Sequence, residues 1–344
     1  MKNKNGFSVV GLTAVAIAAS LTLAACGGGG GSGSPSSSGT SSSGSTGSTS
    51  TTTPAAVTGT LTTPQYAADS VQLASFNLLN QYRQECGFPA LQENTILDTA
   101  AQNHAKYMGL NDVLTDSEVS GSAGFTGVTY VDRAASAGFP SSAYGPGVSV
   151  TTSTTTGNFS ALQYGQQSMY SLLGGVYHAD IAAYPSNTVG IGEYETQVSS
   201  GSYQFTDSWL SLSLLNTQVQ TLANAPLTFP CQGVTGVTYK EVGEIPSPPN
   251  VSSSGWGTPI VVMGNITDVI VLQTATVAGP SGNVAVQILN SATDPNKELN
   301  GYQAVAYPTA PLTPNTQYSV SLTGTVNGTA FSRSFTFSTG NIVG

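Results

Sequence analysis

The fold of this chain is decided in residues 92–118, which read QENTILDTAAQNHAKYMGLNDVLTDSE. One stripe of a helix is predicted from apolar or weakly polar residues spaced by three or four positions: Leu97, Ala101, His104 and Met108. Asn94 precedes this stripe as a typical N-cap, and Gly109 is expected to help close the other end. Because the stripe is narrow and rich in alanine, we expect the helix to pack closely against elements on either side.

A second stretch, residues 177–193, supplies one of those packing partners. It reads YHADIAAYPSNTVGIGE, and the VGIG at 189–192 is typical of a short buried strand. Glycine has no side chain, so Gly190 and Gly192 would let the helix backbone approach this strand closely. The two stretches together predict a helix packed directly on a sheet.

Four segments in order resemble the CAP superfamily of cysteine-rich secretory, antigen 5 and pathogenesis-related proteins. They are FNLLNQYRQECGFPAL, TAAQNHAKYM, DRAASAGF and YHADI followed by VGIG, and they fall between about Ser70 and about Ser211. The match is nearest to the small secreted CAP domains of bacteria. The resemblance implies an α-β-α sandwich, which agrees with helical patterns at 71–83, 132–139 and 159–174 and with strand patterns at 189–192 and 203–207. We therefore expect an α+β domain over residues 65–225.

Residues 1–26 have the features of a secretory signal. Lys2 and Lys4 precede an apolar run from Val9 to Ala25, and no other stretch reaches the roughly 18–20 apolar residues of a membrane span. The final Leu-Ala-Ala-Cys resembles a bacterial lipobox, in which Cys26 is acylated and becomes the mature N-terminus. An ordinary signal peptide cut near an unmodified cysteine is the alternative.

The lipobox interpretation places the protein in the cell envelope, with the lipid membrane as a partner through Cys26. Gly27 after the cysteine resembles signals sorted to the outer membrane of a Gram-negative cell; otherwise the extracellular face of the plasma membrane is expected. Residues 27–64 are almost only Gly, Ser, Thr and Pro, so they bury too little apolar surface to order themselves. They are expected to act as a flexible tether.

The charge composition argues against nucleic acid as a partner. Charged residues make up only 7% of the chain, and removal of the signal leaves 6 basic and 17 acidic residues, a net charge of −11. Such a surface repels phosphate backbones. An unidentified envelope or extracellular ligand is the expected partner besides the membrane.

Two cysteines remain once Cys26 is assigned to lipid. Cys86 and Cys231 form an even pair in an oxidising compartment, which predicts a disulfide between the first domain and the segment that follows it. Two free buried thiols are the alternative.

The pattern changes near Pro226. Alternating apolar residues at 284–288 and 318–322, followed by a hairpin turn at Asn327-Gly328, predict short antiparallel strands over residues 226–344. The end of the chain resembles the last strands of bacterial Ig-like modules, so an all-β Ig-like or fibronectin-like sandwich is expected.

The CAP resemblance implies a cleft of two histidines and two acidic residues that can hold a divalent metal such as zinc. In this chain the first histidine position falls on Asp116, and the glutamate position falls near Gly145-Pro146, where no glutamate occurs. The second histidine corresponds to His178. The family's cleft is therefore incomplete here.

The candidate cleft consists of His178, Asp116 and Glu118, with His178 and Asp116 as the candidate metal ligands. Zinc prefers three or four ligands drawn from Cys, His and carboxylates, so these residues would hold zinc only weakly, and no cofactor is otherwise indicated. A histidine packed in a vestigial cleft is the alternative for His178. His104 lies on the helix stripe, where a hydrogen-bonded core histidine is expected.

Other catalytic patterns are missing from the sequence. There is no Gly-x-Ser-x-Gly nucleophile elbow, and Gly190-Ile-Gly192 lacks the third glycine of a nucleotide-binding loop. We therefore expect a lipid-anchored CAP-domain protein that acts as a non-catalytic binding or interaction module. Two alternatives stay open: a metal-dependent hydrolase that uses the reduced cleft, and a structural spacer or adhesin that acts through the β-sandwich.

Overall fold

The structure is a computed structural model that describes residues 57–344. The expected signal peptide, Cys26 and most of the expected tether fall in residues 1–56, outside the described part. No helix among the described residues is long and apolar enough to cross a membrane.

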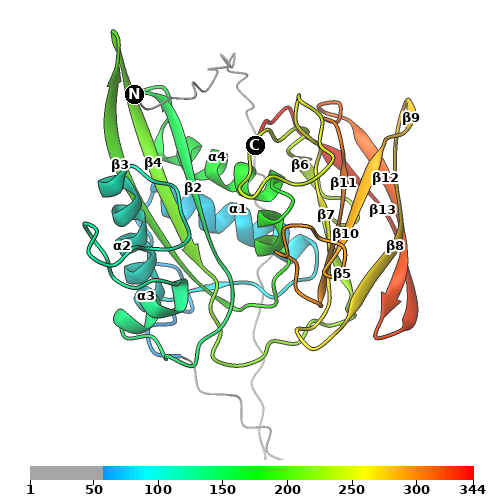
Figure 1. Cartoon of the computed structure of the whole chain (residues 1–344), viewed down its shortest axis with the longest axis horizontal. Helices are drawn as coiled ribbons and strands as arrows, with labels where there is room; N and C mark the ends of the chain where they lie inside the picture. Colours follow the sequence, from blue (N-terminus) through cyan, green and yellow to red (C-terminus); the bar gives the residue numbers. More distant parts are fainter. Residues whose placement is uncertain (1–56) are drawn as a thin grey trace, which may run out of the picture. The chain divides into compact units, whose positions relative to one another are not determined.

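The first part of the described chain mixes helices with strands, as the α+β expectation requires. Its elements are α1 (Val71–Glu85), β1 (Gln92–Glu93), α2 (Thr95–Asn111), α3 (Tyr130–Ser136), β2 (Gly147–Thr155), α4 (Ala161–Gly174), the short 3-10 helix η1 (His178–Ala182), β3 (Thr188–Ser200) and β4 (Tyr203–Ser213). The strands form one sheet in the order β1-β3-β4-β2. Helices α2 and α3 cover one face of the sheet, and α1 and α4 cover the other (Figure 1).

Helix α2 fulfils the prediction made from its sequence. The side chain of Asn94 caps the helix by accepting hydrogen bonds from the backbone N–H groups of Ile96 and Leu97. The predicted stripe is almost completely buried, with exposed fractions of 0–1% for its members: Leu97, Ala101, His104 and Met108. A Cβ atom on Gly190 or Gly192 of β3 would collide with the backbone of α2. The predicted close approach of strand and helix is confirmed.

Gly109 does not close helix α2, which corrects the expectation from the sequence. The helix continues to Asn111, and Asp112 ends it in the left-handed conformation with φ 50°. A Cβ atom on Gly109 would lie 2.5 Å from the ring of Tyr194 in β3. The glycine is therefore required for packing of this helix on the sheet, and the turn chemistry that stops the helix lies three residues later.

The second part of the described chain consists of strands. They are β5 (Leu227–Phe229), β6 (Thr235–Val237), β7 (Ile260–Met263), β8 (Ile270–Gly279), β9 (Gly282–Asn283), β10 (Val286–Asn290), β11 (Gln303–Pro308), β12 (Gln317–Val326) and β13 (Thr329–Thr339). They form a four-stranded sheet, β10-β11-β7-β5, and a five-stranded sheet, β6-β13-β12-β8-β9. Asn327 and Gly328 join β12 to β13 with positive φ angles of 51° and 81°, which confirms the predicted hairpin turn.

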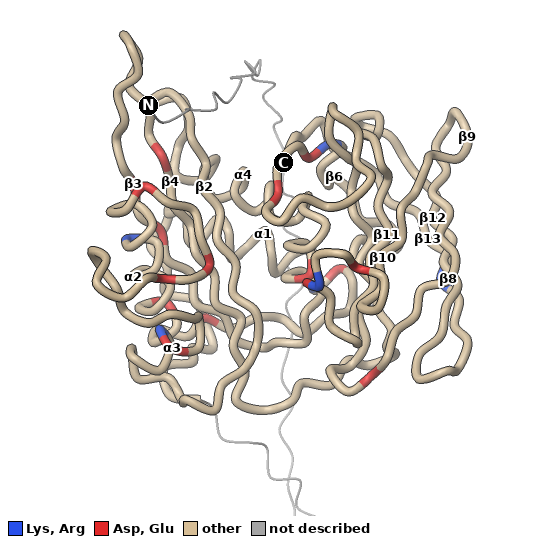
Figure 2. Tube along the Cα trace, in the orientation of Figure 1, with Lys and Arg blue, Asp and Glu red and all other residues tan. Residues whose placement is uncertain are grey.

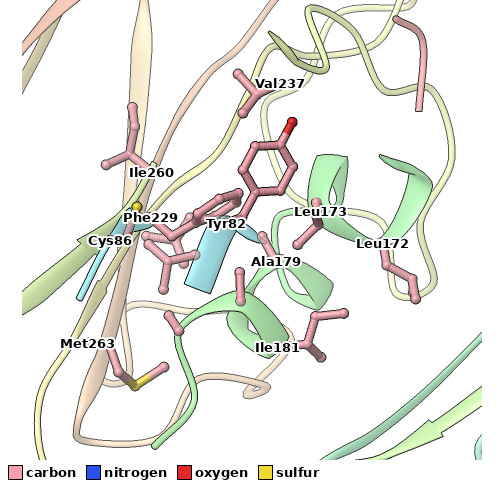
Figure 3. Packing of buried hydrophobic residues seen from close by; sticks show 14 of the residues in the cluster. Tyr82, Cys86, Leu172, Leu173, Ala179, Ile181, Phe229, Val237, Ile260 and Met263 are labelled. Carbon is pink, nitrogen blue, oxygen red and sulfur yellow. The ribbon is translucent and has the colours of Figure 1, made fainter. Parts of the chain in front are cut away.

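One hydrophobic core runs across residue 226 without interruption. Figure 3 shows Tyr82 of α1 and Leu172 and Leu173 of α4 in the same cluster as Phe229 and Ile260. The rings of Tyr82 and Phe229 are tilted against each other with centroids 5.6 Å apart. The two parts of the chain therefore bury apolar surface against each other.

A disulfide reinforces this joint core. Cys86, just after α1, is bonded to Cys231, just after β5, across a sequence separation of 145 residues. The pairing predicted from the cysteine count is confirmed. Closing so long a loop removes much of the freedom of the unfolded chain.

Candidate functional site

His178 is the one histidine that matches the family's cleft, and it stands at the start of η1. Its Nδ1 atom lies 2.7 Å from Oε1 of Glu244, a residue of the segment between β6 and β7. The side chain of His178 is 20% exposed, whereas that of Glu244 is 1% exposed. The histidine is therefore covered by a carboxylate that comes from outside the α+β part of the chain.

The carboxylate of Glu244 is held by backbone as well as by the imidazole. Its Oε2 accepts a hydrogen bond from the backbone N–H of Val176 at 2.8 Å, and its Oε1 accepts from the N–H groups of Tyr177 and His178 at 2.8 and 2.9 Å. Gly175 makes room for it, because a Cβ there would lie 2.6 Å from Oε1. Successive N–H groups that converge in this way form a favourable site for an anion.

Arg83 fixes the far end of η1. Its guanidinium is completely buried and donates to the carbonyl groups of Ile181, Tyr184 and Ser186 at 2.8–2.9 Å, and to that of Pro89 at 3.1 Å. Burial lowers the pKa of Arg83 to about 9, so the side chain remains charged near neutral pH. This anchor positions the η1 segment against α1.

The pKa of His178 is raised above its ordinary value of 6.5. Burial by itself disfavours the imidazolium, but the hydrogen bond and charge of Glu244, together with the charges of Asp116 and Asp180, outweigh that penalty. Two residues further along η1, burial raises the pKa of Asp180 to about 7. His178 and Glu244 are thus an ion pair over a wider pH range than a free histidine would allow.

The other two candidate cleft residues are engaged elsewhere. Asp116 accepts a hydrogen bond from the Tyr130 hydroxyl at 2.7 Å. Glu118 is buried beside His104, with Oε1 2.9 Å from Nδ1 of that ring, and it accepts from the N–H of Thr126. The contacts of Glu118 thus join it to His104, not to His178.

His104 is a hydrogen-bonded core residue, as its place on the helix stripe predicts. Its ring is fully buried between Glu118 on one nitrogen and the carbonyl of Thr115, 2.8 Å from the other. Burial lowers the pKa of His104, and the nearby charge of Arg133 lowers it further against the opposing effect of Glu118. Both ring nitrogens face acceptor atoms, so the ring is held firmly in place while burial makes its charged form more costly.

These arrangements do not suit a zinc ion of the kind that the family's cleft can hold. Within residues 57–344, no group of three His, Cys, Asp or Glu side chains is placed to hold a metal. The carboxylates of Asp116 and Glu118 already have hydrogen-bond partners. Zinc sites need at least three converging ligands, so no catalytic step through a metal is derived.

Two residues of this site could not be found from the sequence pattern. Glu244 lies 66 residues after His178, and Asp180, although inside the YHADI segment, is not one of the candidate cleft residues that the resemblance implies. The only available signal was the scarcity of charge. In a chain with 17 acidic residues, a carboxylate inside a Pro- and Gly-rich connecting segment is conspicuous. Figure 2 shows how thinly charged residues are spread over the fold.

Comparison with known proteins identifies the family of one segment of the chain. Residues 76–196 match the family model described as CAP, the cysteine-rich secretory protein family. This segment is a CAP domain. The matched segment includes His178 but not Glu244, so the CAP domain's histidine is paired with a residue from beyond it. No curated protein gave a significant match to the chain.

Proposed function

We propose that the protein is a secreted, lipid-anchored CAP-domain protein of the bacterial cell envelope that acts as a non-catalytic binding module. The observation that carries this proposal is the pairing of His178 with Glu244. The carboxylate accepts three backbone N–H groups and the imidazole, all at 2.7–2.9 Å. The cleft histidine is thereby part of the scaffold.

The energetics of this contact support a structural role. A hydrogen bond to a charged group contributes about 1.5–3 kcal/mol, and a buried carboxylate that loses its donors costs more. A metal or substrate that needed Glu244 to move away would have to supply that free energy. Binding at this end of the CAP domain is therefore expected beside the pair, with the pair left in place.

One feature favours the alternative, a metal-dependent hydrolase with a reduced cleft. A histidine whose Nδ1 donates to a carboxylate can present its Nε2 to a metal, an arrangement that zinc enzymes use. His178 has such a carboxylate in Glu244. Within the described residues, however, no second and third ligand accompany it.

Zinc titration calorimetry on the chain from residue 27 onward, with the disulfide intact, separates the two functions. We expect no submicromolar zinc binding in the unmodified protein, and an unchanged isotherm for His178→Ala. Glu195→Ala, which removes an exposed carboxylate, serves as the matched control. Submicromolar affinity that disappears in His178→Ala, with hydrolysis lost in parallel, would establish the hydrolase instead.

The proposed anchoring rests on the Leu-Ala-Ala-Cys sequence at 23–26. Acylation of Cys26 would attach residues 27–64 to a membrane and leave the folded part in the aqueous phase. Cys26→Ala should move the protein from the membrane fraction to the soluble fraction and abolish incorporation of a labelled fatty acid. A variant that stays in the membrane fraction and still takes up label would contradict the proposal.

We extend the proposal to the strands after residue 226, which we interpret as an Ig-like sandwich. Two sheets, an Asn-Gly hairpin and a shared core support that interpretation. In this arrangement the sandwich serves the CAP domain by supplying Glu244 and by covering η1. Tyr177 shows the second contact: its hydroxyl donates to Asp294 at 2.8 Å.

A further inference from the structure

A cavity of about 270 Å³ lies where the CAP domain meets the strands that follow it. Its lining includes Tyr144, Asp180 of η1 and Tyr184 from the CAP domain, and Asn300 and Tyr302 from the later strands and loops. Sites between two parts of a chain are common places for small ligands. Neither His178 nor Glu244 lines the cavity, although their charges act on Asp180.

The three tyrosines give the cavity aromatic walls. The rings of Tyr184 and Tyr302 have centroids 6.4 Å apart and an interplanar angle of 57°, so they meet as two sides of a corner. Tyr144 is fixed by paired backbone hydrogen bonds with Asn216 at 3.0 and 2.8 Å. Its hydroxyl is shielded from solvent and has no hydrogen-bond partner among the described residues. The lining is thus rich in aromatic side chains.

Among residues 57–344, Asp180 is the one charged residue that lines the cavity. Its Oδ2 accepts a hydrogen bond from Gln303 Nε2 at 2.9 Å. The ion pairs found among residues 57–344 join His104 and Arg133 to Glu118, and His178 to Glu244, so none of them includes Asp180. The imidazolium of His178 acts on Asp180 from a distance, and burial raises the pKa of Asp180 to about 7, so the carboxyl is mostly ionised only above that pH. An ionised carboxylate among aromatic rings is a favourable position for a further positive charge, and the binding is therefore best measured near pH 8.

We propose that this cavity binds an organic cation, an ammonium group carried by a small molecule or a side chain. The faces of Tyr184 and Tyr302 would contact the cation through their ring electrons, and Asp180 would supply the opposite charge. The wider surroundings are acidic as well: Asp116, Asp294 and Glu298 all contribute negative potential around η1. A neutral sugar would use the same rings, but it would gain nothing from that potential.

This inference deepens the proposed binding role by naming a ligand class and a place. It is tested with choline as the probe and with 3,3-dimethyl-1-butanol, its uncharged carbon analogue of nearly the same shape. We expect choline to shift the NMR signals of the tyrosine rings in a saturable way. The neutral analogue should bind at least about tenfold more weakly, because a desolvated cation–ring contact is worth about that factor.

Variants of the cavity complete the experiment. Asp180→Asn keeps the shape of the side chain and removes its charge, and Tyr302→Ala removes one wall; each should weaken choline binding at least about tenfold. Tyr203→Ala, at a 63% exposed position on the β3–β4 hairpin, should leave the affinity unchanged. Thermal melting of each variant identifies loss of fold, and Tyr302→Ala tests the site independently if Asp180→Asn unfolds.

Three outcomes would overturn the proposal. They are equal binding of choline and its neutral analogue, saturable binding of a neutral monosaccharide with no effect of choline, and choline binding that survives both cavity variants. The zinc titration does not probe this cavity. A failed choline experiment therefore leaves the choice between binding module and hydrolase as that titration decides it.

Discussion

The two histidines of this protein each face a glutamate, yet the two pairs behave differently. His104 and Glu118 are separated by 14 residues, both side chains are 0% exposed, and burial with Arg133 lowers the pKa of the histidine. His178 and Glu244 are separated by 66 residues, the histidine is 20% exposed, and its pKa is raised. The same kind of contact is thus accompanied by a lowered histidine pKa in one place and by a raised one in the other.

The difference follows from which other charges lie near each ring. Beside His104 the guanidinium of Arg133 stands 3.8 Å from Glu118, so the carboxylate's charge is already balanced by a cation. Beside His178 the neighbours are Asp116 and Asp180, and the backbone N–H groups that hold Glu244 carry only partial charges. The histidine pKa is therefore raised where the neighbouring charges are acidic and lowered where a guanidinium is already present.

The largest expected effect comes from breaking the fully buried pair, His104 and Glu118. Glu118→Ala would leave a buried guanidinium and a buried imidazole without their carboxylate, and should lower the free energy of unfolding by about 3–5 kcal/mol. Glu244→Ala removes the acceptor of three backbone donors next to a partly exposed histidine. Water can enter the vacated space and replace most of those hydrogen bonds, so the substitution should cost less, about 1–3 kcal/mol. Chemical denaturation measures both.

The exposed Glu195 supplies the control for that comparison, and Glu195→Ala should change stability by no more than about 0.5 kcal/mol. If Glu244→Ala proves as costly as Glu118→Ala, the His178–Glu244 pair contributes to the core as much as the His104–Glu118 pair does. The proposed difference between the two pairs would then be wrong.

A smaller effect is expected from Gly175→Ala. The new Cβ would lie 2.6 Å from Oε1 of Glu244, while the backbone at φ −70° and ψ 139° suits alanine. The substitution should force the carboxylate away, cost about 1–3 kcal/mol and lower the pKa of His178. NMR titration reads this directly, because the chain contains only 2 histidines.

Gly243→Ala is the matched control for this substitution, since nothing lies within 4 Å of a Cβ at that position. It should leave both histidine titrations unchanged. An unaltered pKa of His178 in Gly175→Ala would mean that the contact with Glu244 does not set that pKa.

The smallest expected effect is on the pH dependence of stability. Because the folded-state pKa of His178 is raised above 6.5, its protonation favours the folded state, and this contribution is fully present below pH 6.5. It disappears as pH rises through the raised value. The lowered pKa of His104 acts in the opposite sense, so its contribution is lost as pH falls below 6.5.

Denaturation of the unmodified protein and of His178→Gln at several pH values tests this sign. The advantage of the unmodified protein should be greater at pH 5.5 than at pH 8.5. An advantage that grows with rising pH would show that burial, and not Glu244, governs this histidine.

Local rules predicted much of the α+β fold. The stripe on α2, the Asn94 cap, the two glycines of β3 and the Asn327-Gly328 turn each depend on residues within a few positions of one another. The disulfide is predictable for a different reason: only two cysteines remain once Cys26 is assigned to lipid.

The expectations that failed or were incomplete depended on contacts between distant segments. Gly109 has the chemistry of a helix end, but the ring of Tyr194 decides its role. His178 was identified from its motif, whereas Glu244 belongs to a segment whose placement depends on the packing of the whole second part of the chain. Glu118 lies two residues after Asp116 and was expected beside His178, but its carboxylate contacts His104.

The shared core around Tyr82 and Phe229 has a practical consequence for anyone who cuts this gene into pieces. The segment that matches the CAP family model ends at residue 196. The apolar residues that bury α1 and α4 extend to Ile260 and beyond. A fragment limited to the matched segment would expose part of the hydrophobic core to solvent, and Cys86 would lack its disulfide partner Cys231. The segment that matches the family is therefore shorter than the unit that needs to fold together. A fusion to another protein should include everything from α1 to β13.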